Sequence, residues 1–410
     1  MARSLREMGA STFSSLRIRN YRLYYVGQAI STSGTFMQTI AQAWLVLKLT
    51  NSGTALGIVA ALQNLPVLLL APWGGLVADR FPKRTLLLLT QSAFGIVALI
   101  FGGFVVTGLV RLWMVYVLAL VFGVINCVDN PVRQSFVVEM VGKEELKNAV
   151  TLYSSMVNLA RVIGPALAAL LISLLGLGPC FVANGLSYAA VLVMLLAMST
   201  QELHPAAPLA HVAGQIMGGF RYVYSTPILR NVLVIMAIIG TLTYEFQVSL
   251  PLLAQFTFHG DASSYAALTA ALGLGAVIGG LVTASRRSTS IKVVVVAAFG
   301  FGASALLAAL MPTLPLAVAG VILVGFFSIL FSSSGNTTLQ LASDPQMRGR
   351  VMALWAIAFL GSTTIGGPII GFIGEHANPR WGLATGGMAA ILAGAYGAAA
   401  IRTRHARQDV

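Results

Sequence analysis

Charged residues are scarce in this sequence. Of its 410 residues, 9% are Asp, Glu, Lys or Arg, whereas 57% are hydrophobic. Soluble domains carry about 25% charged residues, and a surface facing water on all sides cannot be built from so few. The composition therefore argues against a cytosolic enzyme. The length instead accommodates about twelve membrane-spanning helices of roughly 22 residues each.

Metal ligands and catalytic motifs are also missing. The two cysteines, Cys127 and Cys180, lie in apolar runs and suggest neither a disulfide framework nor a metal site. The histidines all fall in polar stretches between apolar runs: His204, His211, His259, His376 and His405. The sequence has no Walker loop, no GxSxG and no cluster of metal ligands. We therefore expect no enzyme, no cofactor, no metal and no direct ATP coupling.

Long apolar runs separated by short basic connectors fill most of the chain. The expected spans are 22–47, 54–78, 85–108, 113–137, 148–175, 179–199, 229–256, 264–284, 292–312, 315–340, 350–374 and 381–401. A run of this length must satisfy its backbone hydrogen bonds internally, which favours helices. A β-barrel would need short segments of alternating hydrophobicity. The N-terminus lacks the apolar core and cleavage site of a secretory signal, so we expect the first span to be retained.

The formal net charge of +13 indicates topology rather than nucleic acid binding. With the N-terminus inside, only Lys48, Arg111 and Arg380 fall on outer connectors, and Arg161 lies within a span. The other basic residues are on the inner side: Arg3, Arg6, Arg17, Arg19, Arg22, Arg80, Lys83, Arg84, Arg133, Lys143, Lys147, Arg221, Arg230, Arg286, Arg287, Lys292, Arg348, Arg350, Arg402, Arg404 and Arg407. Lys and Arg collect in cytoplasmic loops, so both termini are expected in the cytoplasm.

Three short sequences recur in the same order in the two halves of the chain. The pairs are GGLVADR at 74–80 with GGLVTASRR at 279–287, NPVRQ at 130–134 with NTTLQ at 336–340, and Gly-Pro at 164–165 with Gly-Pro at 367–368. The order predicts an all-α membrane protein of twelve transmembrane helices in two pseudo-symmetric six-helix bundles. The expected domains are 1–199 and 229–410, joined by a cytoplasmic connector at 200–228.

The connector after the second span carries a motif. Residues 75–84 read GLVADRFPKR, which resembles the Gly-x-x-x-Asp-Arg-x-x-(Arg/Lys)-(Arg/Lys) signature of the major facilitator superfamily. The matching residues are Gly75, Asp79, Arg80, Lys83 and Arg84. Pro82 stands where the family usually has Gly, and Ala284 stands at the position in the second half that corresponds to Asp79.

The resemblance implies the major facilitator fold and a cytoplasmic gate. In the family this motif stabilises the outward-open state, a role that the resemblance carries to Asp79 and Arg80. Gly75 would allow a close approach of helices, and Asp79 would accept hydrogen bonds from a helix N-terminus or pair with a neighbouring Arg. The alternative is a basic topology loop with no part in gating.

The stretches DNPVRQSF, NLARVIGPALAALL and YEFQVSLPLLAQ resemble a bacterial branch of siderophore and drug exporters. The expectation is a monomeric transporter in the bacterial inner membrane. It would export a small amphipathic compound in exchange for protons by alternating access. A facilitator, an importer or a lysolipid flippase on the same fold stay open, as does a non-transporting membrane sensor. The sequence names no substrate.

Three charged residues fall within spans: Asp129, Arg161 and Glu245. An ionised group at the centre of a span costs about 2.5–3.5 kcal/mol on insertion scales, so each needs a partner or a wet cavity. Asp129 has several candidate partners, namely Arg161, Arg133 one turn on, and Arg80 or Arg84. Its role is a gate network with Arg133, contact with protons or substrate, or packing alone.

Glu245 has no cation near its depth in the second half, so burial favours its neutral form. It is the first candidate for proton coupling or cation recognition, and a protonated structural Glu is the alternative.

Uncharged polar residues repeat at helical spacing in the first and fifth spans. They either line a substrate cavity or hydrogen-bond between helices. The cavity candidates are Gln28, Gln38, Gln42, Gln63, Asn126, Asn158, Arg161, Tyr244 and Glu245. The two Gly-Pro pairs, Gly164 with Pro165 and Gly367 with Pro368, are expected either to act as hinges or to pack helices closely.

Overall fold

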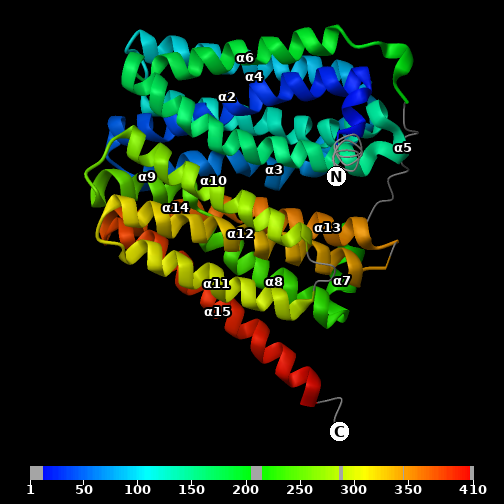
Figure 1. Cartoon of the computed structure of the whole chain (residues 1–410), viewed down its shortest axis with the longest axis vertical. Helices are drawn as coiled ribbons and strands as arrows, with labels where there is room; N and C mark the ends of the chain where they lie inside the picture. Colours follow the sequence, from blue (N-terminus) through cyan, green and yellow to red (C-terminus); the bar gives the residue numbers. More distant parts are fainter. Residues whose placement is uncertain (1–12, 205–214, 286–289, 345, 407–410) are drawn as a thin grey trace, which may run out of the picture. The chain divides into compact units, whose positions relative to one another are not determined.

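The computed structural model describes residues 13–204, 215–285, 290–344 and 346–406. Nearly all of them are helical, and they contain no strand. The α-helices (Figure 1) are α2 (Arg19–Thr50), α3 (Gly53–Arg80), α4 (Lys83–Val106), α5 (Leu112–Leu175), α6 (Gly178–Leu196), α7 (Gln215–Ser225), α8 (Pro227–Leu242), α9 (Phe246–Leu252), α10 (Ala262–Ser285), α11 (Ile291–Leu310), α12 (Leu314–Ala342), α13 (Arg348–Ala356), α14 (Thr363–His376) and α15 (Pro379–Ala406). This confirms the all-helical fold class.

Within the described residues, eleven segments are long and apolar enough to cross a membrane. The expected first span forms α2, which is 32 residues long but is not among them. Its polar side chains, which include Gln28, Gln38 and Gln42, lower its hydropathy. The other expected spans each coincide with one of the eleven segments.

The longest helix, α5, contains two spans, Leu112–Gly142 and Glu144–Leu175. The chain changes direction at Gly142, whose φ of 70° and ψ of −175° are not helical. A residue with a Cβ rarely adopts this φ, whereas glycine does so at little cost. Gly142 therefore lets two apolar runs follow each other without a loop between them.

Two expected spans are interrupted rather than continuous. The span at 229–256 is built from α8, α9 and a π-helical turn at Leu253–Thr257, with a break at Thr243–Glu245. The span at 350–374 consists of α13, a π-helical turn at Ile357–Gly361 and α14. Such turns are frequent at functional sites, and discontinuous helices form substrate and ion sites in many transporters.

The helices group into two contact units. One comprises Met1–Gln42 with Leu69–Ala210, and the other comprises Ala43–Leu68 with His211–Val410. The end of α2 and the first half of α3 thus belong to the second unit. The domain boundaries at 199 and 229 stay a prediction, and residues 205–214 of the expected connector lie outside the described residues. So do several basic residues of the orientation argument: Arg3, Arg6, Arg286, Arg287 and Arg407.

The repeated GGLV sequence makes the same contact in each unit. A Cβ on Gly74 of α3 would collide with the carbonyl of Cys127 in α5, and a Cβ on Gly279 of α10 would collide with the carbonyl of Phe326 in α12. Gly75 has open space around it. The close approach that we expected at Gly75 is therefore wrong by one residue, and Gly74 makes it.

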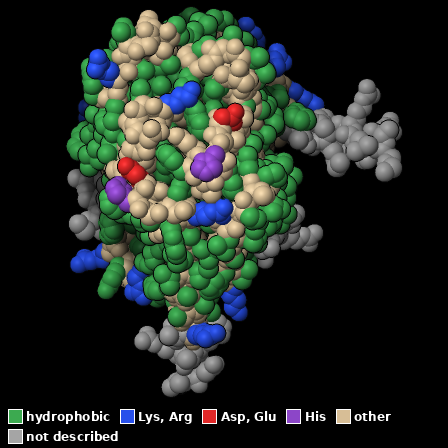
Figure 2. Space-filling model, turned by 90° about the vertical axis from the view of Figure 1, so that its left-hand side faces the viewer, with side chains coloured by type: hydrophobic (Ala, Val, Ile, Leu, Met, Phe, Trp, Pro, Cys, Tyr) green, Lys and Arg blue, Asp and Glu red, His purple; other side chains and the backbone are tan. Residues whose placement is uncertain are grey.

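The surface of the described residues is rich in exposed hydrophobic side chains. Leu69, Trp73, Leu89, Leu174 and Leu392 are among the most exposed. Figure 2 shows one face, on which hydrophobic side chains predominate and charged ones are few. A soluble monomer rarely exposes so much contiguous apolar surface, so these side chains are expected to face lipid.

Candidate functional site

At the break between α8 and α9, three consecutive residues each contact a different helix of the same unit. Thr243 donates a hydrogen bond to the carbonyl of Gly386 in α15 at 2.8 Å. Tyr244 donates one to the carbonyl of Ser328 in α12 at 2.6 Å. Glu245 points toward α14. The break is therefore held from three sides, as a site of fixed geometry requires.

The carboxylate of Glu245 is buried against the start of α14. Its side chain is hydrogen-bonded to Thr363, and an added Cβ on Gly366 would lie 2.9 Å from Oε1. Only 2% of the residue is exposed, and Oε1 has no hydrogen-bond partner among the described residues. Among these residues it also has no ion pair. A carboxylate with an unsatisfied buried oxygen is costly unless it is neutral or receives a ligand.

Tyr244 lies in an aromatic cluster beside this carboxylate. Its ring contacts Phe301 of α11 at 5.2 Å between centroids and Phe359 of the π-helical turn at 5.0 Å, both edge-to-face. Because Phe359 precedes Thr363 by four residues, one helical face contacts both Tyr244 and Glu245.

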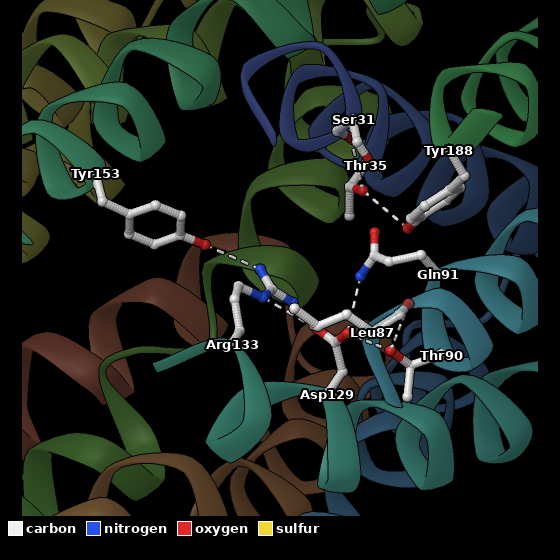
Figure 3. Close-up of polar contacts among 9 residues, drawn as sticks. All are labelled: Ser31, Thr35, Leu87, Thr90, Gln91, Asp129, Arg133, Tyr153 and Tyr188. Carbon is white, nitrogen blue, oxygen red and sulfur yellow. Dashed lines mark hydrogen bonds and ion pairs between the residues drawn. The ribbon is translucent and has the colours of Figure 1, made fainter. Parts of the chain in front are cut away.

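Asp129 is the second buried carboxylate, and it lies in the first unit (Figure 3). Its Oδ1 accepts hydrogen bonds from Thr90 at 2.7 Å and from Gln91 at 2.8 Å, both on α4. Its Oδ2 forms an ion pair with Arg133, one turn along α5. Of the candidate partners, the structure thus selects Arg133.

The guanidinium of Arg133 also donates to the hydroxyl of Tyr153 at 3.0 Å. Tyr153 follows the reversal at Gly142, so Arg133 connects the two spans of α5. The sequence did not single out Thr90, Gln91 or Tyr153. Polar residues at 90 and 91 within an apolar run were the available signal for the first two.

Two basic residues of the motif at 75–84 make contacts that the structure shows. Lys83 forms an ion pair with Glu139 at 2.6 Å. Arg84 donates to the carbonyls of Leu195 at 2.9 Å and Leu196 at 3.1 Å, at the end of α6. A cation at these carbonyls is favoured by the helix dipole. Asp79 is half-buried and Arg80 is exposed.

The polar face of α2 is largely enclosed by neighbouring helices. Thr35 is hydrogen-bonded to Tyr188 at 3.1 Å, and Gln38 accepts from Asn184 at 2.7 Å, both on α6. Gln28 and Gln42 are also buried. Hydrogen bonding between helices, one of the two roles left open, thus occurs along this face.

The other predicted cavity residues are divided between the two units. Gln63 lies in the same unit as Glu245, whereas Asn126, Asn158 and Arg161 lie in the other. Gln63, Asn126 and Asn158 are half-buried, and Arg161 lies over the ring of Phe36 at 5.7 Å. A single cavity lined by all of these residues therefore stays a prediction.

Both Gly-Pro pairs lie at close helix contacts. A Cβ on Gly164 would lie 2.8 Å from the carbonyl of Ser33, so Gly164 and Pro165 pack α5 on α2. A Cβ on Gly367 would lie 2.9 Å from the carbonyl of Gly57, so Gly367 and Pro368 pack α14 on α3. Close packing is thus present at both pairs, and their action as hinges stays a prediction.

A multi-span helical bundle with interrupted helices and a buried carboxylate at one break has the architecture typical of membrane transporters. Residues 10–409 match the transmembrane secretion effector family, and the chain belongs to that family.

The chain is similar to several curated transporters along most of its length. The enterobactin exporter EntS of Shigella flexneri is 26% identical over 382 residues, which cover 91% of this chain and 90% of that protein. The multidrug efflux pump Tap of Mycolicibacterium fortuitum is 26% identical over 371 residues, covering 84% and 88%. The staphyloferrin A transporter of Staphylococcus aureus is 23% identical over 326 residues, covering 78% and 81%.

Solved structures share the fold. A bacterial homologue of the human lysosomal transporter Spinster matches with a TM-score of 0.72 at 15% identity, covering 94% of this chain and 96% of that one. The nucleoside transporter NupG matches with a TM-score of 0.71 at 11% identity, covering 93% and 99%. These similarities confirm the major facilitator fold.

Proposed function

We propose that this protein exports a small amphipathic organic compound from the bacterial cytoplasm in exchange for protons. It would do so as a monomer in the inner membrane, with both termini in the cytoplasm, by alternating between states open to either side. Export is supported by the names of the relatives, which are a siderophore exporter and a drug efflux pump among others.

The proposed exchange of protons rests on the position of Glu245. Its carboxyl is buried beside Gly366, has an oxygen without a hydrogen-bond partner among the described residues, and lies where α8 stops. A carboxyl group that exchanges protons must be unfavourable in its charged form while it is buried, so that it binds a proton there. It must also gain access to water in another state, so that it can release the proton. Rearrangement at a helix break relieves that cost when the site opens to water.

The test is proton-coupled transport in proteoliposomes that hold the pH dye pyranine. Ethidium and iron-free enterobactin serve as probes. The wild type should move a probe against its gradient when a pH gradient is imposed and should move protons when a probe gradient is imposed. Glu245→Gln should abolish both coupled movements. It should leave downhill probe exchange within a few-fold of wild type, because a neutral amide resembles the protonated carboxyl.

Glu202→Gln is the matched control, since Glu202 is exposed on a connector outside the spans. It should transport like the wild type. Coupled transport that persists in Glu245→Gln with an unchanged pH dependence would contradict the role of Glu245. Wild-type transport that ignores both the pH gradient and the membrane potential would indicate a facilitator instead.

A further inference from the structure

The connector helix α7 packs on its own unit through one face and exposes the other. Gly219 and Val223 are buried, whereas Phe220, Arg221 and Tyr224 are exposed. The exposed fraction is 53% for Phe220 and 74% for Tyr224. Because residues four apart share one side of a helix, Phe220 and Tyr224 form an exposed aromatic strip, with Arg221 at its edge.

The packed face of α7 is held against the neighbouring helix α13 (Figure 1). The hydroxyl of Tyr222 accepts a hydrogen bond from the backbone N–H of Asp344 at 3.1 Å, in the link before α13. The side chain of Arg350 lies against two glycines of α7. A Cβ on Gly218 would lie 2.9 Å from Nη1 of Arg350, and one on Gly219 would lie 3.0 Å from its Cβ. These contacts fix which side of α7 faces outward.

Arg230, in the first turn of α8, extends back to the aromatic strip. Its guanidinium lies over the ring of Tyr224, 5.5 Å from the centroid, and its Nη1 donates to the carbonyl of Tyr224 at 3.4 Å. A guanidinium has five N–H donors, and Arg230 forms no ion pair within the described part of the chain. Its position is therefore fixed while donors remain for an anion.

Positive charge is in excess around this strip. The helices α7, α8 and α13 contain no Asp or Glu, and their basic residues are Arg221, Arg230, Arg348 and Arg350. Asp344, in the link before α13, is exposed. The span Pro227–Thr257 begins directly after α7, so the strip and its cations lie where a membrane surface is expected.

We infer that α7 and the first turn of α8 form a binding site for an anionic phospholipid of the surrounding membrane. The lipid phosphate binds Arg221 and Arg230, and the glycerol and upper acyl chains lie on Phe220 and Tyr224. Helices with an apolar strip and a basic edge lie in the interface of a membrane in this way, and basic side chains there favour anionic lipids. A soluble phosphate would use the two cations but not the aromatic strip. The inference is independent of what the protein transports.

The first experiment measures lipid binding to the delipidated full-length protein by native mass spectrometry. Dioleoyl phosphatidylglycerol is compared with dioleoyl phosphatidylcholine, which has the same acyl chains and no net charge. The wild type should bind the anionic lipid more tightly. Arg221→Gln with Arg230→Gln should weaken that binding about 25-fold, since each basic residue near an anionic surface contributes about fivefold in affinity. Binding of phosphatidylcholine should not change.

Arg17→Gln with Arg19→Gln is the matched control. Both arginines are exposed, and they lie in the other contact unit, on the predicted inner side. The control removes the same charge and should bind phosphatidylglycerol like the wild type. Equal losses in the two double variants would overturn the site, because net charge alone would then explain them. An unchanged affinity in Arg221→Gln with Arg230→Gln would overturn it as well.

Tyr224 tests the aromatic part of the site. Tyr224→Ala removes the ring beneath Arg230 and should weaken phosphatidylglycerol binding about two- to fivefold, the range for an exposed cation–π contact. Tyr224→Phe keeps the ring and should bind like the wild type. Equal losses in Tyr224→Ala and Tyr224→Phe would contradict the role of the ring.

Glycerol 3-phosphate distinguishes a lipid from a soluble phosphate. It carries a phosphate but no acyl chains, so even a large excess should not displace phosphatidylglycerol, and displacement would overturn the lipid assignment. Melting temperatures give a second readout. In detergent alone, Arg221→Gln with Arg230→Gln should melt like the wild type, because both changes lie at the surface. Added phosphatidylglycerol should stabilise the wild type, and equal stabilisation of this variant would overturn the inference.

Discussion

At the scale of residues, the pairing of Asp129 with Arg133 makes a prediction about stability. The Asp129 side chain is fully buried, whereas 21% of the Arg133 side chain is exposed. Arg133→Leu would leave a buried carboxylate without its cation, which costs about 3–5 kcal/mol in comparable buried pairs. We expect a lower melting temperature of the purified protein, measured in detergent by intrinsic fluorescence.

The double variant Asp129→Asn with Arg133→Leu isolates the cause. It removes the stranded charge while Thr90 and Gln91 keep a polar partner, so it should be more stable than Arg133→Leu alone. If the double variant is less stable than the single one, the loss comes from the packing of Arg133 rather than from the unpaired carboxylate.

Charged residues in apolar runs are visible in a sequence, and their partners are not. Asp129 and Glu245 were identified because burial of a charge always requires an explanation. The partner of Asp129 stayed open among several cations at suitable helical or loop positions. Tyr153 could not be found, since its contact with Arg133 depends on the chain reversal at Gly142.

At the scale of elements, adjacent glycines in the two repeats make opposite predictions. Gly74 and Gly279 each lie against a carbonyl of a neighbouring helix, whereas a Cβ on Gly75 meets nothing within 4 Å and one on Gly280 meets only Ile329 at 3.9 Å. Gly74→Val and Gly279→Val should therefore lower thermal stability by about 1–3 kcal/mol, as overpacked contacts do.

Gly75→Val and Gly280→Val are the matched controls, each one residue away on the same helix. They should stay within about 0.5 kcal/mol of the wild type, the usual range for substitutions away from close contacts. Chemical denaturation in mixed micelles measures all four variants. Equal losses within a pair would mean that β-branching in the helix, rather than helix contact, sets the cost.

The helix breaks show where apolar patterns stop being informative. The run at 229–256 stays hydrophobic through Thr243, Tyr244 and Glu245, so hydropathy predicts one helix. The break arises because each of these side chains bonds to a different helix, and those contacts are tertiary. Element existence follows from local sequence, whereas interruption of an element depends on partners distant in the chain.

At the scale of the whole molecule, scarcity of charge shapes the fold, and the placement of the few basic residues predicts the orientation. Long runs without charge can lie in the apolar part of a membrane, where the backbone N–H and C=O groups must form hydrogen bonds within the helices. The basic residues gather in alternate connectors. The repeated GGLV contact in the two units is consistent with a duplicated six-helix plan. The sequence repeat does not predict the role of each half, because Asp129 and Glu245 have different surroundings in the two units. Those surroundings are known only from three-dimensional contacts.

The orientation is itself testable with reporters. A green fluorescent protein fused after Val410 should be fluorescent, because it folds in the cytoplasm, while alkaline phosphatase at the same place should be inactive for lack of an oxidising compartment. Phosphatase fused after Gly108, in the link between α4 and α5, should instead be active.

Replacing Arg80, Lys83 and Arg84 by Gln should make a minority of molecules insert the wrong way, since these bases lie close to two spans. The same replacement at Lys292, Arg348 and Arg350 should have less effect, because the first spans usually dominate insertion. Phosphatase activity after Val410 in the unmodified chain would reverse the predicted orientation.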